Sequence, residues 1–238
     1  MDLGEIFGDA LVYPAHNIKS LLIYAILGVI GAIIGGASIL SILGAFGTTG
    51  WGSFAFSGVG IVGVIVFILI LFLIGGYALD IIKFGIERRD DGPGIDFGRQ
   101  IANAVKLIIV DLVYYVVPAI IVFILGIFLK NWIISIISVI LFIVFALANF
   151  MAKCRLTKTD NIGEALAIGE AIGDISRVGL LKIIATIIIM IIVAIVALII
   201  IGWISRLNGI IGSILLGIFL VYFIFFYNRA IGLLYSDV

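Results

Sequence analysis

Six long apolar runs constrain the fold of this chain more than any other feature. They cover residues 21–43, 61–77, 107–129, 132–150, 183–203 and 210–227. An α-helix rises about 1.5 Å per residue, so about 20 apolar residues span the roughly 30 Å hydrocarbon core of a bilayer. Hydrophobic residues make up 64% of the chain and charged residues 12%, which lies outside the range of soluble domains. We therefore expect an all-α integral membrane protein with six transmembrane helices.

A short motif precedes the apolar runs three times, as Asp2-Leu3-Gly4-Glu5, Asp96-Phe97-Gly98-Arg99 and Asn161-Ile162-Gly163-Glu164. The first and third copies begin segments, residues 2–13 and 161–175, whose apolar positions have the spacing of an amphipathic helix. The second copy, residues 96–106, continues directly into an apolar run. Asp2 and Glu5 also have the spacing of a capping box.

Each copy of the motif precedes two apolar runs, which predicts three hairpin units, each preceded by an amphipathic helix. The units cover about 1–90, 91–158 and 159–238 of a single membrane domain over residues 1–238. The connection at Lys130-Asn131 has room only for a tight turn, so the fourth run returns antiparallel to the third. A second turn is expected at residues 206–209.

The basic residues predict the orientation of the helices. All of the 14 basic residues except Lys130 and Arg206 fall on the side of the two termini. The positive-inside rule places that side in the cytoplasm. The tryptophans at 51, 132 and 203 fall at the opposite ends of the runs, as in an aromatic belt. We expect a multi-pass protein of the cell membrane, with both termini and all three amphipathic helices cytoplasmic.

The sequence lacks the side chains that most catalytic and metal sites need. Cys154 is the only cysteine and His16 the only histidine, which excludes an intrachain disulfide and a multi-ligand Cys/His zinc site. The glycine-rich residues 44–60 contain no Lys followed by Ser or Thr, as a phosphate-binding loop requires. The 14 basic and 14 acidic residues cancel, so no net charge favours nucleic acid. We expect no enzyme activity, no metal or other cofactor and no nucleic-acid partner.

Asp111 is the only acidic residue well inside an expected crossing. An ionisable side chain at that depth is costly unless it is paired, and it is a functional candidate by default. Two interpretations remain open: a structural ion pair, or a group that lines an ion or substrate pathway. The expected partners are cations at the inner ends of other crossings, namely Lys83, Lys153, Lys182 and Arg229.

Four further polar residues lie near the inner ends of the crossings and complete the candidate set with Asp111 and Arg229. Asp80 and Lys83 are three residues apart on one helix face, where they can pair at the membrane edge. Asn149 and Asn228 end the fourth and sixth crossings. We expect each asparagine to form an interhelical hydrogen bond.

Several of these segments resemble a known family. Residues 75–79 (GGYAL) end a crossing, an acidic Pro-Gly loop follows, and then come Asp96-Phe97-Gly98 and residues 106–118 with Tyr114-Tyr115 and Pro118. This order is similar to the archaeal membrane family catalogued as domain of unknown function 4013. Residues 161–165 resemble its third unit, so the resemblance covers nearly the whole chain. It implies a small multi-pass protein of an archaeal cell membrane, with no catalytic residues to transfer and no assigned function.

Two hypotheses for function follow. The first is a non-enzymatic membrane protein that organises lipid or a partner complex through its cytoplasmic surface helices. Its partners would be membrane lipids and a second protein or a second copy of the chain. The alternative is a small transporter or channel in which Asp111 and Asp80 line a cytoplasmic vestibule. The identity of a substrate or partner does not follow from the residues.

Overall fold

The computed structural model describes residues 1–45 and 51–238, and its regular structure in these residues is α-helical. The helices are α1 (Leu3–His16), α2 (Ile18–Ala45), α3 (Trp51–Ile86), α4 (Phe97–Phe128), α5 (Asn131–Thr159), α6 (Ile162–Ala165), α7 (Ile168–Val178), α8 (Leu180–Leu207) and α9 (Gly209–Tyr235). Six of the described helices, α2 to α5, α8 and α9, are long and apolar enough to cross a membrane. The predicted all-α class is confirmed, and so is the presence of six helices with the length and composition of membrane spans. Part of the glycine-rich stretch, residues 46–50, lies outside the described residues.

The three copies of the sequence motif each begin a helix. Asp2 caps α1, because its side chain accepts a hydrogen bond of 2.8 Å from the backbone N–H of Glu5. The Glu5 side chain accepts one of 2.9 Å from the N–H of Asp2, so the predicted capping box is confirmed. Asp96 caps α4 through the N–H of Arg99 at 3.0 Å. Asn161 caps α6 through the N–H two residues further on at 2.8 Å.

Two helix ends differ from the expectation. The first amphipathic segment is predicted over residues 2–13, but α1 continues to His16 with Pro14 inside it. Pro14 removes one backbone hydrogen bond but does not end the helix. The segment expected over residues 161–175 is divided into the single turn α6 and the longer α7. In contrast, the motif at residues 96–106 and the following apolar run form one continuous helix, α4.

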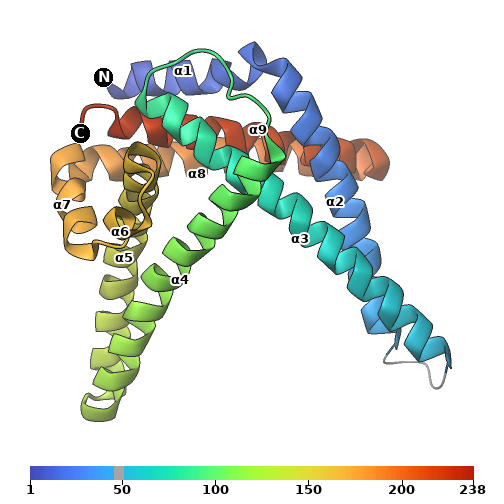
Figure 1. Cartoon of the computed structure of the whole chain (residues 1–238), viewed down its shortest axis with the longest axis horizontal. Helices are drawn as coiled ribbons and strands as arrows, with labels where there is room; N and C mark the ends of the chain where they lie inside the picture. Colours follow the sequence, from blue (N-terminus) through green and yellow to red (C-terminus); the bar gives the residue numbers. More distant parts are fainter. Residues whose placement is uncertain (46–50) are drawn as a thin grey trace.

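Three pairs of consecutive long helices are in contact, α2 with α3, α4 with α5 and α8 with α9, and α3 also packs against α4 and α9. Figure 1 shows the three pairs diverging from the region where α1 and both chain termini lie. Residues 129–130 join α4 to α5, and residue 208 alone joins α8 to α9, as the two predicted turns require. The pairs expose large apolar side chains, with Leu207 86% and Phe128 79% exposed near two of the connections. Such surfaces are suited to lipid rather than water.

The buried core lies where the pairs converge. Helix α1 contributes Ile6 and Ala10, both fully buried, and they belong to one apolar cluster with Phe226 and Ala230 of α9. Phe7 packs against Phe226 with ring centroids 6.0 Å apart. The apolar side of α1 therefore contacts protein at these positions.

Candidate functional site

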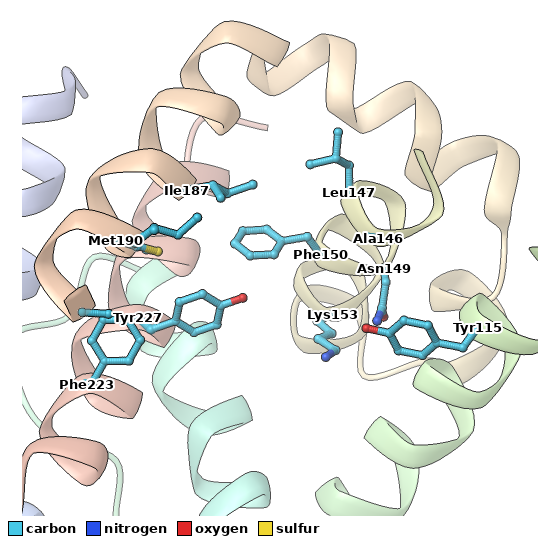
Figure 2. Close-up of a pocket in the computed structure, with 12 residues that line it drawn as sticks. Tyr115, Ala146, Leu147, Asn149, Phe150, Lys153, Ile187, Met190, Phe223 and Tyr227 are labelled. Atoms are coloured by element: carbon cyan, nitrogen blue, oxygen red, sulfur yellow. The ribbon is translucent and has the colours of Figure 1, made fainter. Parts of the chain in front are cut away.

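A cavity of about 410 Å³ opens between the α4–α5 pair and the α8–α9 pair. We call it the inter-pair cavity (Figure 2). Its walls are mostly apolar and come from four helices. The lining residues are Tyr115 of α4; Ala146, Leu147, Asn149, Phe150 and Lys153 of α5; Ile187, Met190, Ile191 and Ala194 of α8; and Phe223 and Tyr227 of α9. The rings of Phe150 and Tyr227 meet edge to face with centroids 5.7 Å apart, so they connect the two pairs at this level.

One corner of the inter-pair cavity is polar. The ammonium group of Lys153 lies 2.8 Å from an Asp111 carboxylate oxygen, and the Asn149 amide donates a hydrogen bond of 2.7 Å to the same oxygen. Lys153 is one of the predicted partners of Asp111, and Asn149 forms the predicted interhelical bond. Figure 2 shows the Tyr115 ring pointing toward Asn149. The Asn149 side-chain oxygen is buried and accepts no hydrogen bond from the described residues.

Asp80 belongs to a different group of residues. Arg99 of α4 lies 3.0 Å from its carboxylate, and the Asn103 amide donates to the other carboxylate oxygen at 2.9 Å. The close ion pair of Asp80 is therefore with Arg99 rather than with Lys83. The reason is tertiary: a Cβ added at Gly76 of α3 would lie 1.8 Å from the Gln100 carbonyl oxygen. This close approach of α3 and α4 brings Arg99 to Asp80.

Arg229 of α9 is fully buried and contacts several other elements. Its guanidinium group donates to both carboxylate oxygens of Asp9 on α1, at 2.6 and 3.0 Å. It also donates to the carbonyl oxygen of Phe84 at 3.1 Å and to that of Arg89. The guanidinium carbon lies 4.5 Å from the centre of the Tyr13 ring. These acceptors belong to α1, to the end of α3 and to the loop after it. The Arg229 side chain therefore links α9 to all three segments.

Asn228, the residue before Arg229, has a local role. Its amide donates a hydrogen bond of 2.7 Å to the carbonyl oxygen of Ile224, one turn earlier in α9. The predicted interhelical bond of Asn228 is therefore replaced by a bond within its own helix. The side chain is short, and the carbonyl group one turn earlier is within its reach.

Sequence reasoning missed one buried charge, Asp174 of α7. It is fully buried and pairs with Arg155 of α5 at 3.1 Å and with Arg177 at 2.9 Å. The hydroxyl group of Tyr235 donates to it at 2.6 Å. The one available sequence signal was the spacing of Asp174 and Arg177, three residues apart on one helix. The burial of Asp174 depends on its contacts with Arg155 and Tyr235, which belong to other segments of the chain.

Residues 59–206 match the family described as "Protein of unknown function (DUF4013)". The match covers more than half of the chain. The chain belongs to the DUF4013 family. The matched residues include the α4, α5 and α8 walls of the inter-pair cavity, whereas its α9 wall lies beyond them. No curated protein and no solved structure matches the chain.

The DUF4013 chain gathers no metal-ligand cluster in the residues that the structure describes: no three His, Cys, Asp or Glu side chains come together there. Cys154 is buried and forms no disulfide. The remaining chemistry of the candidate site is ion pairing and hydrogen bonding at one end of an apolar space. Such an arrangement can hold a molecule with a polar head and an apolar chain.

Proposed function

We propose that this DUF4013 protein is a non-enzymatic membrane protein that organises lipid by holding an amphipathic membrane molecule in the inter-pair cavity. The main observation behind this proposal is that one cavity of about 410 Å³ has both apolar walls and a polar corner. Sites for small ligands are typically about 300–1,000 Å³, mostly apolar, with a few polar groups that fix orientation. The cavity has both properties.

The polar corner favours a neutral head group. The charge of Lys153 is balanced by Asp111 at 2.8 Å, so the corner offers hydrogen-bonding groups rather than a net charge. The buried Asn149 oxygen lacks a donor among the described residues, and an unpaired buried acceptor is destabilising. That oxygen has almost no accessible surface, so the group that a ligand hydroxyl reaches is the ammonium of Lys153, whose side chain lines the cavity and is 29% exposed. The ligand class that fits is a hydroxyl-bearing lipid such as a diacylglycerol or a long-chain alcohol.

The cavity supports this role better than the surface helices do. Ile6 and Ala10 of α1 and Ala171 of α7 are fully buried in the protein, so these side chains have no surface to offer to lipid. The transporter alternative has less support, because Asp80 and Asp111 are each paired with a cation. Asp80 also lines a different pocket from the partners of Asp111. We retain cytoplasmic termini as part of the proposal, on the distribution of basic residues.

Filling the cavity tests the proposal. Ala146 lines the cavity, whereas Ala119 of α4 is exposed outside it, so Ala146→Trp and Ala119→Trp form a matched pair. Purified full-length protein in mild detergent is titrated with dioleoylglycerol, and binding is measured by native mass spectrometry. We expect binding to the parent and to Ala119→Trp, and binding about tenfold weaker or more to Ala146→Trp. Equal binding to all three proteins would contradict the proposal.

A further inference from the structure

A second pocket, smaller and more polar than the inter-pair cavity, lies between α3, α4 and α5. It encloses about 160 Å³, and we call it the basic pocket. Three cations line it, Lys83, Arg99 and Lys106, together with two carboxylates, Asp80 and Asp160. Cations therefore outnumber carboxylates. All of them lie on the parts of α3, α4 and α5 at the basic side of the chain, where the positive-inside rule places the cytoplasmic membrane edge.

The three cations differ in how strongly they pair with carboxylates of the protein. Arg99 is held by Asp80 at 3.0 Å. Lys83 has no carboxylate within ion-pair distance among residues 1–45 and 51–238. Lys106 lies 2.5 Å from Asp160, but the Asp160 side chain is 77% exposed. An exposed ion pair contributes little free energy, so Lys106 can exchange this carboxylate for another anion.

We propose that Lys83 and Lys106 bind a phosphate group in the basic pocket, while Arg99 remains on Asp80. Lysine ammonium groups are compact charges that bind phosphate oxygens through charge-assisted hydrogen bonds. Basic pockets between transmembrane helices at the cytoplasmic edge are suited to anionic head groups. The site is separate from the inter-pair cavity and does not depend on the proposed function. Its phosphate can belong to a lipid head group or to a soluble compound.

A substitution at Asp160 is expected to strengthen phosphate binding, whereas substitutions of the two lysines are expected to weaken it. Asp160 caps the end of α5 in the left-handed conformation, with φ of 52°, which asparagine adopts more readily than most residues. Asp160→Asn therefore keeps the backbone and removes the carboxylate that competes for Lys106. We expect this variant to bind phosphate more tightly than the parent. Lys83→Gln and Lys106→Gln should bind it more weakly, by about fivefold for each lysine.

The experiment uses purified full-length protein in mild detergent, titrated separately with dioleoylphosphatidylglycerol and with inorganic phosphate. Lys19→Gln is the matched control, because Lys19 is an exposed lysine on the same basic side and does not line the pocket. It should bind like the parent. Ala146→Trp should also bind like the parent, which separates this site from the inter-pair cavity. Raising the salt concentration should weaken binding to the parent.

The two titrations identify the source of the phosphate. Tighter binding of phosphatidylglycerol supports a lipid head group, and tighter binding of inorganic phosphate supports a soluble phosphate compound. The proposal is overturned if the parent binds neither probe. It is also overturned if the Lys83→Gln, Lys106→Gln double variant binds like the parent, or if Asp160→Asn binds no more tightly than the parent.

Discussion

Gly85 of α3 and Gly232 of α9 are in direct backbone contact. A Cβ added at Gly232 would lie 2.3 Å from the Ile82 carbonyl oxygen and 2.8 Å from the Gly85 Cα. A Cβ added at Gly85 would lie 2.9 Å from the Arg229 carbonyl oxygen. Small residues allow helix backbones to approach this closely. The two glycines therefore fix the crossing of α3 and α9 and, with it, the position of the buried Arg229 side chain.

Gly232→Ala is predicted to destabilise the protein, because the added methyl group meets backbone atoms that cannot rotate away. Overpacking of this kind typically costs about 1–3 kcal/mol. Thermal unfolding of the purified protein in detergent, followed by circular dichroism, measures the effect. The control is Gly75→Ala, where the added Cβ meets nothing within 4 Å and alanine favours the helix by about 0.5–1 kcal/mol. Equal unfolding temperatures for the two variants would argue against the crossing.

Arg229→Met is predicted to be severely destabilising. It leaves Asp9 without its partner and removes the donors to the carbonyl groups of Phe84 and Arg89. Breaking a buried ion pair on one side typically costs about 3–5 kcal/mol. Arg229→Lys should lie between the parent and Arg229→Met, because an ammonium group cannot reproduce the bidentate geometry.

Loss of the Arg229 contacts is expected to release α1 from the rest of the protein. Limited proteolysis of the variants should therefore cut within residues 2–16 at lower protease concentration than in the parent. Adding Asp9→Leu to Arg229→Met should recover part of the stability, since no charge is then left unpaired. If the double variant is as unstable as both single losses combined, the pair with Asp9 is not the main contribution of Arg229.

The helices and their caps could be predicted because their signals are local. Apolar length alone predicts six membrane-spanning helices, and the capping box of Asp2 and Glu5 depends on residues three positions apart. The sequence also narrows the partner of Asp111 to four basic residues, among them Lys153, because few cations are expected at its depth. The division of the chain into three repeated units remains a prediction.

The pairings that sequence reasoning missed depend on how helices cross. Asp80 could be placed at the membrane edge, but its partner follows from the contact of Gly76 with the backbone of Gln100. Asp174 could be assigned to a polar helix face, but its complete burial follows from Tyr235, 61 positions away. Neither crossing leaves a periodic signal in the sequence. The inter-pair cavity is missed for the same reason, since its walls come from four helices.

The orientation predicts which sites are reachable from outside the cell. Single cysteines at Arg206, Asp91 and Lys158 are introduced in a Cys154→Ser background. All three positions are exposed on the protein surface, so differences in labelling report the side of the membrane rather than burial. An impermeant thiol reagent on intact cells should label position 206 and leave 91 and 158 unlabelled until the cells are opened. Labelling of 91 and 158 alone on intact cells would invert the topology.

Asp111→Asn separates the lipid-holding function from transport. The Asp111 side chain is 37% exposed and that of Lys153 is 29% exposed, so we expect loss of the pair to cost about 1 kcal/mol, at the upper end for exposed pairs. In a double-mutant cycle, Lys153→Met should add little to Asp111→Asn, because either change removes the same contact.

The transporter alternative predicts a different result for the same variant. A transport group is not optimised for stability, so Asp111→Asn would unfold at the parent temperature or above it. It would also lose a proton- or substrate-linked flux that the parent shows in reconstituted vesicles. The lipid-holding function predicts lower stability, altered dioleoylglycerol binding and no flux in the parent. A stable Asp111→Asn protein that has lost a measurable flux would favour the transporter and leave the Lys153 pair as part of its pathway.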